Sequence, residues 1–311
     1  MCMQDVNQYS DTLVKIAELH FIENYSQAKI AEMLSLSKPT VSRMVRRAVE
    51  TGLVSIRINS TMHNFQKLAK DVENRYGLHK VFVVRSNDND IESMKSDAAR
   101  YAAEYVCSIA NNNDLIGMSH GSTVFHILKH LQPVASISVN AIQLIGNGTS
   151  NYPYVQGSYV VQELARILGG TAYVMPLPMS VRSKLLHTLF MEEGFVQAHF
   201  KRFNNLKIAV VGIGTQVIQY ETEEIRPLIA IPSDFAGEIC CRLFSDEGEP
   251  LETGYQEHCF GISFDELRAV PEVIGLAVGS NKLRAVKGAL KTGMIKTLIT
   301  DERIASYLLQ N

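Results

Sequence analysis

Seven short apolar runs, separated by longer stretches of helical periodicity, occupy the chain from Lys80 onward and limit the folds that it can adopt. Continuous apolar strands that alternate with helices are typical of a mostly parallel sheet covered on both faces. We therefore predict an α/β, Rossmann-like fold for this region. The runs are VFVV at 81, LIGMS at 115, VNAIQLIG at 139, TAYVMPLP at 171, IAVVGIG at 208, VIGLAVG at 273 and TLIT at 297.

Chain length leaves room for a second, smaller domain before this region. With 311 residues, of which 46% are hydrophobic, the chain can bury a full core and still form two domains. We predict a small domain over residues 1–58 and a larger one over residues 59–311. In the small domain a helix over 10–21 should pack on its neighbours and a short strand over 53–58 should close the unit. A helix over 62–76 either links the domains or pairs with a partner chain.

The stretch from Ser26 to Glu50 has the spacing of two short helices that meet at a tight turn. The first helix is expected over 27–34, and the small side chain of Ala31 suits the point where the two helices cross. The second helix begins with Ser37 as its N-cap, with Pro39 in the first turn. Its inward stripe should be Val41, Val45 and Ala48 with Val49. This pattern predicts a helix-turn-helix that reads DNA.

The outer face of the second helix combines short hydroxyls with long cations. Cations reach phosphate oxygens, and an arginine can also bind a guanine edge through two hydrogen bonds. The alternative is a solvated basic face on an ordinary helix, but the helix-crossing spacing and the capped turn favour DNA binding. The predicted DNA-binding residues are Gln27, Ser37, Lys38, Thr40, Ser42, Arg43, Arg46 and Arg47.

Charge and cysteine content exclude several other classes of protein. A net charge of −2 and a pI near 6.5 are not those of a general polyanion binder, so positive charge should be local. The five cysteines form no CxxC pair, which argues against a zinc ribbon and against a secreted disulfide framework. No leader and no apolar run near 18 residues is present, so we predict a cytoplasmic protein without a membrane partner. No metal and no cofactor is predicted.

Polar residues gather in the loops that follow the predicted strands, where a parallel sheet of this kind binds its ligand. Glycine and hydroxyl residues are concentrated in the loops 117–123, 146–149, 212–215 and 279–282. In the first of these, Ser122 and Thr123 should lie at the N-terminus of a helix, which is the geometry of a phosphate site. For any one loop the alternative is a turn that only needs a positive φ.

Two charged residues extend this prediction. Lys282 follows the second-last strand and begins a helix over 283–290, so its ammonium could reach an anion held over the strand ends; the alternative is an ordinary exposed lysine. Glu238 lies in an otherwise apolar stretch and either caps a neighbouring helix or accepts hydrogen bonds from ligand hydroxyls. A carboxylate cannot help to hold a phosphate, so a sugar hydroxyl is its sensible partner.

Five segments of the chain closely resemble the SorC family of bacterial transcriptional regulators, sometimes grouped with the deoxyribonucleoside regulators, and the likeness spans almost the whole chain. They are YSQAKIAEMLSLSKPTVSRMVRRAVETGLVSIRI, GMSHGSTV, AVVGIGT, AGEICCRLFSDEGE and AVGSNKLRAVKGAL. The resemblance implies a DNA-binding N-terminal domain joined to an effector domain related to sugar-phosphate isomerases. It also implies a tetramer that dissociates from its operator, or binds it differently, when a phosphorylated sugar or polyol binds.

The same resemblance assigns roles to particular residues. Ser122 and Thr123 resemble the phosphate-binding pair, with Lys282 as the charge partner, and Glu238 and Gln156 resemble hydroxyl partners. The full set of predicted effector-binding residues is Ser119, Gly121, Ser122, Thr123, Asn147, Gln156, Gly212, Gly214, Glu238, Gly279 and Lys282.

The chain departs from the family pattern at two places. Ala236 stands before Gly237-Glu238 where relatives usually have valine, which leaves the acid in place. The loop after AIQLI carries no lysine or arginine, so an open-chain aldehyde cannot be captured there as an imine, which needs a desolvated amine. A phosphate contact common among relatives is missing with it, which makes a bisphosphate sugar a poorer candidate.

Three other functions compete with that of a regulator. An isomerase would have only Glu238 and Lys282 for its chemistry and would not explain the helix-turn-helix. The letters GxSxG at 117–121 could indicate a hydrolase, for which His258 with Asp234 or Asp246 is the only candidate set. A protein-binding module would leave the polar loops unused.

We therefore predict a DNA-binding regulator of a carbohydrate-utilisation operon, and within that class a repressor. One helix-turn-helix covers only half of a DNA site, so we expect a homo-oligomer, either a dimer or a tetramer. Its predicted partners are operator DNA and a phosphorylated sugar or polyol.

Overall fold

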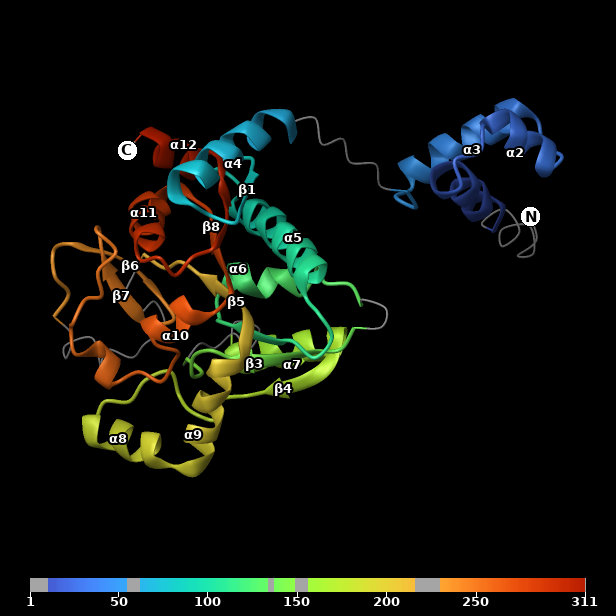
Figure 1. Ribbon diagram of the computed structural model, residues 1–311. Coiled ribbons are helices and arrows are strands. Elements are labelled where there is room, and N and C mark those ends of the chain that lie inside the picture. The colour runs from blue at the N-terminus through green and yellow to red at the C-terminus, as the bar shows by residue number, and fades with distance from the viewer. Residues whose placement is uncertain (1–10, 55–61, 134–136, 149–155, 216–229, 311) are drawn as a thin grey trace. The chain divides into compact units, whose positions relative to one another are not determined.

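The chain forms two compact units, Met1–Ser60 and Thr61–Asn311, which are described separately. The computed structural model, shown in Figure 1, describes residues 11–54, 62–133, 137–148, 156–215 and 230–310. Within these residues no helix combines the length and the apolar character needed to span a bilayer.

The smaller unit contains the predicted pair of helices, α2 (Gln27–Met33) and α3 (Lys38–Glu50). Each begins at a serine whose side chain accepts a backbone N–H from the first turn, Ser26 from Lys29 and Ser37 from Thr40. These N-caps satisfy donors that a helix start leaves unpaired. A further helical segment over residues 11–17 runs into the π-helix Glu18–Ile22. The expected helix-turn-helix is therefore present.

The core of this unit corrects one detail of the predicted stripe. Ala31 and Val41 are buried as expected, but Val49 is 38% exposed and Met44 is buried in its place. At 3.6 residues per turn, Val49 lies roughly 80° around the helix axis from Val41, outside the inward stripe. Of the strand expected over 53–58, residues 53 and 54 form a bend and the remainder lies outside the described residues.

All seven apolar runs form strands of one seven-stranded sheet, in the order β1-β9-β8-β5-β2-β3-β4. Every pair of neighbouring strands is parallel. The mostly parallel α/β sheet predicted from the sequence is confirmed. Its strands are β1 (Lys80–Val84), β2 (Leu115–Met118), β3 (Val139–Gln143), β4 (Gly169–Tyr173), β5 (Leu206–Gly212), β8 (Glu272–Ala277) and β9 (Thr297–Asp301).

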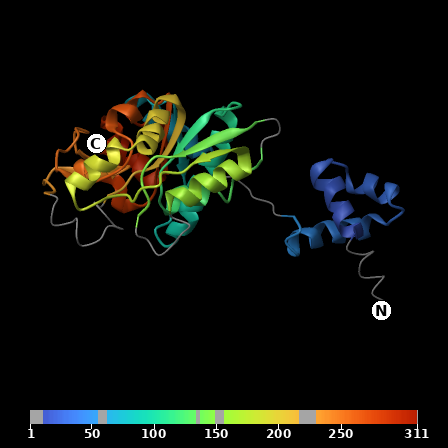
Figure 2. The same ribbon diagram turned by 90° about the horizontal axis from the view of Figure 1, so that it is seen from below.

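Helices cover both faces of the sheet, as Figures 1 and 2 show from two directions. One face packs on α5, α6 and α7, and the other packs on α4, α9, α11 and α12, so the buried residues form two apolar layers. The helices are α4 (Met62–Tyr76), α5 (Ile91–Ile109), α6 (Ser122–Ile127), α7 (Gly157–Leu168), α8 (Lys184–Glu192), α9 (Gly194–Lys201), α10 (Phe264–Ala269), α11 (Leu283–Lys291) and α12 (Glu302–Gln310), with 3₁₀ turns at Arg202–Asn205, Tyr255–Glu257 and Ser280–Lys282.

An antiparallel hairpin that the sequence did not reveal lies beside the main sheet. It consists of β6 (Phe235–Ile239) and β7 (Arg242–Ser245), joined by the two residues Cys240 and Cys241. Both cysteines have positive φ, 51° and 60°, as a tight hairpin turn of the primed type requires. Such turns usually carry asparagine and glycine, so the cysteine pair gave no turn signal in the sequence.

Asp301 links three segments at the carboxyl edge of the sheet. Its carboxylate is buried at the end of β9 and accepts the N–H of Gly279 at 2.7 Å and the hydroxyl of Ser86 at 2.9 Å. It also accepts the N–H groups of Arg303 and Ile304 in the first turn of α12. One side chain thus holds the loops after β1 and β8 against the start of the last helix.

We expect Asp301→Ala to lower the free energy of unfolding by about 2 to 4 kcal/mol, because it leaves the buried N–H groups of Gly279 and Ile304 without their acceptor. Asp265→Ala, at a carboxylate whose side chain is 94% exposed, is the matched control and should change stability by less than about 0.5 kcal/mol. Urea unfolding followed by circular dichroism measures both. Equal stability of the two variants would contradict the role given to Asp301.

Candidate functional site

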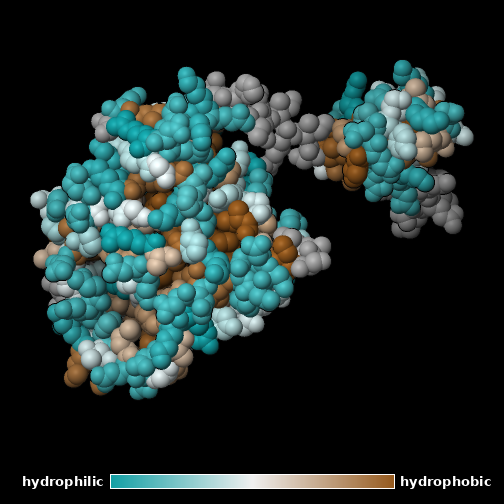
Figure 3. Space-filling view, in the orientation of Figure 1, coloured by the Kyte–Doolittle hydropathy of each residue, from teal (hydrophilic) through white to brown (hydrophobic). Residues whose placement is uncertain are grey.

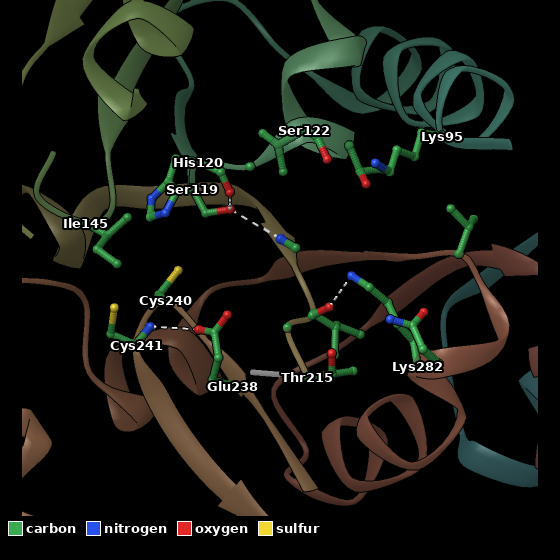
Figure 4. A pocket seen from close by; sticks show the side chains of 18 of the residues that line it. Lys95, Ser119, His120, Ser122, Ile145, Thr215, Glu238, Cys240, Cys241 and Lys282 are labelled. Carbon is green, nitrogen blue, oxygen red and sulfur yellow. Dashed lines mark hydrogen bonds between the residues drawn. The ribbon is translucent and has the colours of Figure 1, made fainter. Parts of the chain in front are cut away.

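A cavity of about 310 Å³ lies at the carboxyl ends of the central strands. Figure 4 shows it from close by. A water molecule occupies about 30 Å³ of liquid, so the cavity has the volume of roughly ten waters and lies at the lower end of the range for small-molecule sites. The volume suits a small metabolite.

Strand order explains why three of the four polar loops meet here. The chain leaves β2 for β3 toward one edge of the sheet and leaves β8 for β9 toward the other, with β5 between them. The loops after β2, β5 and β8 therefore surround one crevice, as expected where the winding of an open sheet changes direction. The predicted residues that line the cavity are Ser119, Gly121, Ser122, Thr123, Gly212, Gly214, Glu238 and Lys282.

Asn147, Gln156 and Gly279 are not among the lining residues. The side-chain oxygen of Asn147 accepts a hydrogen bond from Gln143, and the amide of Gln156 donates to the backbone of the same loop. The N–H of Gly279 donates to Asp301. These groups hold the loops in shape around the cavity.

The loop after β2 presents Ser122 and Thr123 at the start of α6. The residue before them, Gly121, has φ 127° and provides no side-chain cap, so the first turn of the helix keeps backbone donors that no side chain covers. The helix ends at Ile127. Thr123 is 8% exposed and lines the cavity.

Two lysines reach the cavity, where sequence reasoning identified one. Lys282 donates from Nζ to the carbonyl of Ile213 at 2.6 Å, and burial lowers the pKa of Lys282 while the charge of Glu238 opposes that change. The second is Lys95 on α5, which also pairs with Glu92 at 2.7 Å. In Figure 4, Lys95 and Lys282 lie toward the same end of the cavity.

Only the expected position of α5 beside the polar loops could have indicated Lys95. The helix α5 follows the edge strand β1, so its first turns begin at the same carboxyl edge as the polar loops. The prediction considered only the loops themselves, and a lysine on the second turn of a helix gave no signal of its own. Lys282 is therefore not the sole cation at the site.

The carboxylate of Glu238 is fixed by its own hairpin and by Gly214. Backbone hydrogen bonds run in both directions between these two residues, at 2.9 and 3.0 Å. Oε2 of Glu238 also accepts the N–H of Cys241 at 3.0 Å. A Cβ on Gly214 would lie 2.0 Å from Oε1 of Glu238, so only glycine permits this approach. The carboxylate is thereby held at the cavity wall.

At the opposite end of the cavity apolar side chains pack beside Ser119 and His120. Ile145, Met179, Leu243 and Tyr255 are each less than 5% exposed and belong to a small apolar cluster separate from the two main layers. The thiols of the hairpin turn lie at the same end in Figure 4, and burial raises the pKa of Cys240 well above its usual value. None of these residues was predicted, because an apolar strand-end residue cannot be told from ordinary core in a sequence.

The triad required by the hydrolase alternative is not assembled. The hydroxyl of Ser119 accepts the N–H of Gly212 at 3.2 Å, and it donates to the adjoining carbonyl of His120. His258 is not a lining residue, and its Nδ1 lies 2.9 Å from the carbonyl oxygen of Val181. Ser119 therefore ties the loops after β2 and β5 together.

Comparison with known proteins identifies the family of the larger unit. Residues 60–310 match the family described as "Putative sugar-binding domain". The chain belongs to this family. The membership expected from the sequence, that of the SorC-type regulators, is confirmed.

The relatives match over nearly their full length. The deoxyribonucleoside regulator of Bacillus subtilis (strain 168) is 27% identical over 305 residues, covering 96% of this chain and 97% of the relative. The sorbitol operon regulator of Klebsiella pneumoniae is 28% identical over 311 residues, with the same coverage. The crystal structure of full-length SorC from that organism gives a TM-score of 0.87 at 26% identity, over 96% of this chain and 97% of that one.

The imidazole of His120 predicts a pH dependence of stability. Burial lowers the pKa of His120 from 6.5 to about 4. Between pH 4 and pH 6.5 the unfolded chain therefore binds more protons than the folded chain. The contribution of His120 to stability is complete above pH 6.5 and is lost as the pH falls toward 4. We expect the free energy of unfolding of the natural protein to fall by about 2 to 3 kcal/mol more than that of His120→Gln between pH 7 and pH 4. Urea unfolding at both values measures this, and identical pH dependence of the two proteins would contradict it.

Proposed function

We propose that this chain is a DNA-binding transcriptional regulator whose binding to its operator is controlled by a phosphorylated sugar or polyol bound in the cavity. The observation that carries the proposal is the convergence of Lys95, Lys282 and the hydroxyls of the loop after β2 on one end of a cavity, in a chain that also contains a helix-turn-helix. The relatives named for deoxyribonucleoside, sorbitol and erythritol regulation support the same class of function.

The exposed face of α3 supports the proposal for DNA. Lys38, Arg43, Arg46 and Arg47 are exposed, while Thr40 and Ser42 are half-buried on the same helix. The hydroxyls of Ser37 and Thr40 lie 2.8 Å apart at the helix start, so part of their hydrogen bonding serves the cap. Gln27 is half-buried at the start of α2. The arginines and Lys38 therefore provide the face that meets DNA.

The polar end of the cavity suits a phosphate. A dianion would gain from two ammonium groups and from the donors at the start of α6. It would also raise the pKa of Lys282 back toward its usual value, which keeps that lysine charged. Glu238 repels the phosphate and accepts a hydroxyl from the carbon chain instead. The phosphate beside the lysines and the hydroxyl beside Glu238 together fix the orientation of the ligand in the cavity.

We propose that the functional form is a homo-oligomer, either a dimer or a tetramer. A single helix-turn-helix reads half of a DNA site, and two copies place their recognition helices about one DNA turn apart. The helix α8 supports assembly because it buries none of its side chains and exposes Leu185 and Leu189 by 69% and 50%. Apolar side chains at that part of the surface can be followed in Figure 3.

An isomerase is the second candidate, because Glu238 and Lys282 line the same cavity and could act as base and electrophile. We propose that no turnover occurs, since the described lining residues offer Glu238 as the one carboxylate. Incubation of the purified protein with sugar phosphates separates the two functions. Conversion of any of them would identify an enzyme.

The test of the proposal is a DNA-shift assay with the full chain and a DNA fragment that it selects. Pentose, hexose and polyol phosphates are added in turn, each beside its unphosphorylated form. A phosphorylated compound should release or remodel the complex, and its free form should not. If no phosphorylated compound changes the complex, the proposed control by a phosphorylated effector fails.

We expect Ser122→Glu to abolish the response to the phosphorylated effector, because it places a carboxylate where the phosphate belongs. DNA binding itself should survive, since the substitution lies in the other unit. Ser108→Glu, at an exposed serine on α5, is the control and should respond normally. A normal response of Ser122→Glu in the DNA-shift assay would show that the phosphate binds elsewhere.

We expect Arg43→Ala to weaken operator binding by about 1 to 3 kcal/mol through loss of a base contact, with less effect on unrelated DNA. Arg166→Ala, at an exposed arginine of α7, is the matched control and should bind as the natural protein does. Affinities are measured at one fixed salt concentration. Unchanged binding by Arg43→Ala would refute the assignment, and equal weakening on all sequences would make the contact one with phosphate.

A further inference from the structure

Two adjacent thiols line the cavity, and the proposed function assigns them no chemistry. Cys240 and Cys241 join β6 to β7, and both are free, 5% and 8% exposed, and part of the cavity lining. In Figure 4 their sulfur atoms point from the turn in the same general direction, into the cavity. A reagent small enough to enter the cavity can therefore meet both sulfur atoms at once.

The turn is conformationally unfavourable for cysteine. Cys240 and Cys241 have φ values of 51° and 60°, in the left-handed region where residues other than glycine and asparagine are strained. Two-residue hairpin turns of this kind usually carry Asn-Gly or Gly-Gly. Glycine would relieve the strain at either position, but it would remove a thiol from the cavity wall. Two strained residues therefore stand where both present sulfur to the cavity.

The two sulfur atoms have different surroundings. Sγ of Cys241 accepts the hydroxyl of Tyr255 at 3.4 Å, a donor that stabilises negative charge on this sulfur during a reaction. Burial, and after it the charge of Glu238, raises the pKa of Cys240 well above its usual value, so this thiol keeps its proton at neutral pH. Cys241 is consequently the sulfur that attacks an electrophile, and Cys240 is the neighbour that completes the reaction.

The backbone of the turn is connected to the attachment of the hairpin. The N–H of Cys241 donates to Oε2 of Glu238 at 3.0 Å, and Glu238 exchanges two backbone hydrogen bonds with Gly214 near the end of β5. A bond between neighbouring cysteines joins residues whose Cα atoms are about 3.8 Å apart, whereas the Cα atoms of ordinary disulfides are roughly 4.4 to 6.8 Å apart. Closing so small a ring must change the dihedral angles of the turn and move the N–H of Cys241 away from Glu238.

We propose that Cys240 and Cys241 form a redox-sensitive pair, which a small peroxide converts into a reversible disulfide that loosens the contact between the hairpin and the end of β5. The inference goes beyond the proposed function and does not depend on the identity of the effector.

With hydrogen peroxide the reaction needs no other reagent. Sγ of Cys241 attacks one peroxide oxygen, the O–O bond breaks, and the departing hydroxide takes up the thiol proton as water, which leaves a sulfenic acid. Sγ of Cys240 then attacks that sulfur. The S–S bond forms, the S–O bond breaks, and the hydroxyl leaves with the proton of Cys240 as a second water. The two thiols are oxidised and the peroxide is reduced. A thiol reductant reverses the change, and the strain of the small ring makes this reduction easier.

The first test treats the full chain with hydrogen peroxide, alkylates the free thiols and identifies the peptides by mass spectrometry. We expect the peptide that contains Cys240 and Cys241 to escape alkylation and to lose the mass of two hydrogens, and dithiothreitol should restore both thiols. Cys241→Ser should not form the disulfide. Cys259→Ser, at a buried cysteine of the same apolar cluster that is not a lining residue, is the matched control and should form it as the natural protein does.

Phenylarsine oxide tests the pair without the strain of a direct S–S bond. Its arsenic binds two thiols, its oxygen leaves as water with the two thiol protons, and the ring that closes is larger. Because the second sulfur binds intramolecularly, the natural protein should bind this arsenical roughly 10²- to 10⁴-fold more tightly than Cys240→Ser or Cys241→Ser does. Cys107→Ser, on α5 outside the lining residues, should bind it as the natural protein does. Equal affinity of the natural protein and Cys241→Ser would overturn the pairing of the two thiols.

Hydrogen exchange followed by mass spectrometry tests the structural consequence. In the oxidised chain the N–H groups of Gly214, Glu238 and Cys241 should exchange at least about 10-fold faster than in the reduced chain, because their acceptors are displaced. Peroxide should leave the exchange of Cys241→Ser unchanged. Unchanged exchange in the oxidised natural chain would overturn the switch. Oxidation that stops at a sulfinic acid, or that joins Cys241 to Cys259, would overturn the disulfide itself.

Discussion

The cavity depends on the pair of backbone hydrogen bonds between Gly214 and Glu238, which join the β6–β7 hairpin to the end of β5. The seven-stranded sheet alone would provide polar loops along an open edge. The hairpin adds a wall opposite them, and it brings the carboxylate of Glu238 and the thiols of Cys240 and Cys241 into the lining of the cavity. A Cβ on Gly214 would meet the Glu238 carboxylate in its present position, so glycine lets the carboxylate lie against this strand end. The roles that we assign to Glu238 and to the hairpin wall follow from this attachment.

The attachment also explains why the cavity has two chemistries. The end bounded by α5, α6 and the start of α11 collects lysines and hydroxyls from the sheet and its helices. The end bounded by the hairpin rests on a separate apolar cluster. Binding energy at the first end depends on charge and on desolvation of the lysines, while binding at the second depends on the area of carbon removed from water. In the proposed function, binding of the phosphate and contact with the rest of the ligand are therefore carried by different elements of the fold.

The sequence was sufficient for features that depend on local periodicity. It predicted the helix pair around Ser37, the seven strands, and the grouping of Ser122, Thr123 and Lys282 at one edge, because apolar runs and capped turns are local signals. It missed the hairpin because Cys240 and Cys241 adopt a turn conformation that their residue type does not suggest. Lys95 was missed because its role depends on where α5 begins in space.

The remaining differences have the same origin. Asn147 and Gln156 carry side chains that could bind a hydroxyl, but in the fold they hold the loop after β3. Val49 belongs to the right helix but lies outside the inward stripe, where Met44 is buried. Residue type and spacing indicated which side chains are able to bind a ligand. Which of them line the cavity was decided by contacts between segments far apart in the chain.

A crystal structure of the full chain with a bound phosphorylated sugar or polyol is the most direct test of this account. The account predicts that the phosphate oxygens lie within hydrogen-bond distance of Nζ of Lys95, Nζ of Lys282 and Oγ of Ser122. It also predicts that a hydroxyl of the ligand lies within hydrogen-bond distance of the Glu238 carboxylate. A phosphate bound at the loop 146–149, or a ligand in the reverse orientation, would contradict it.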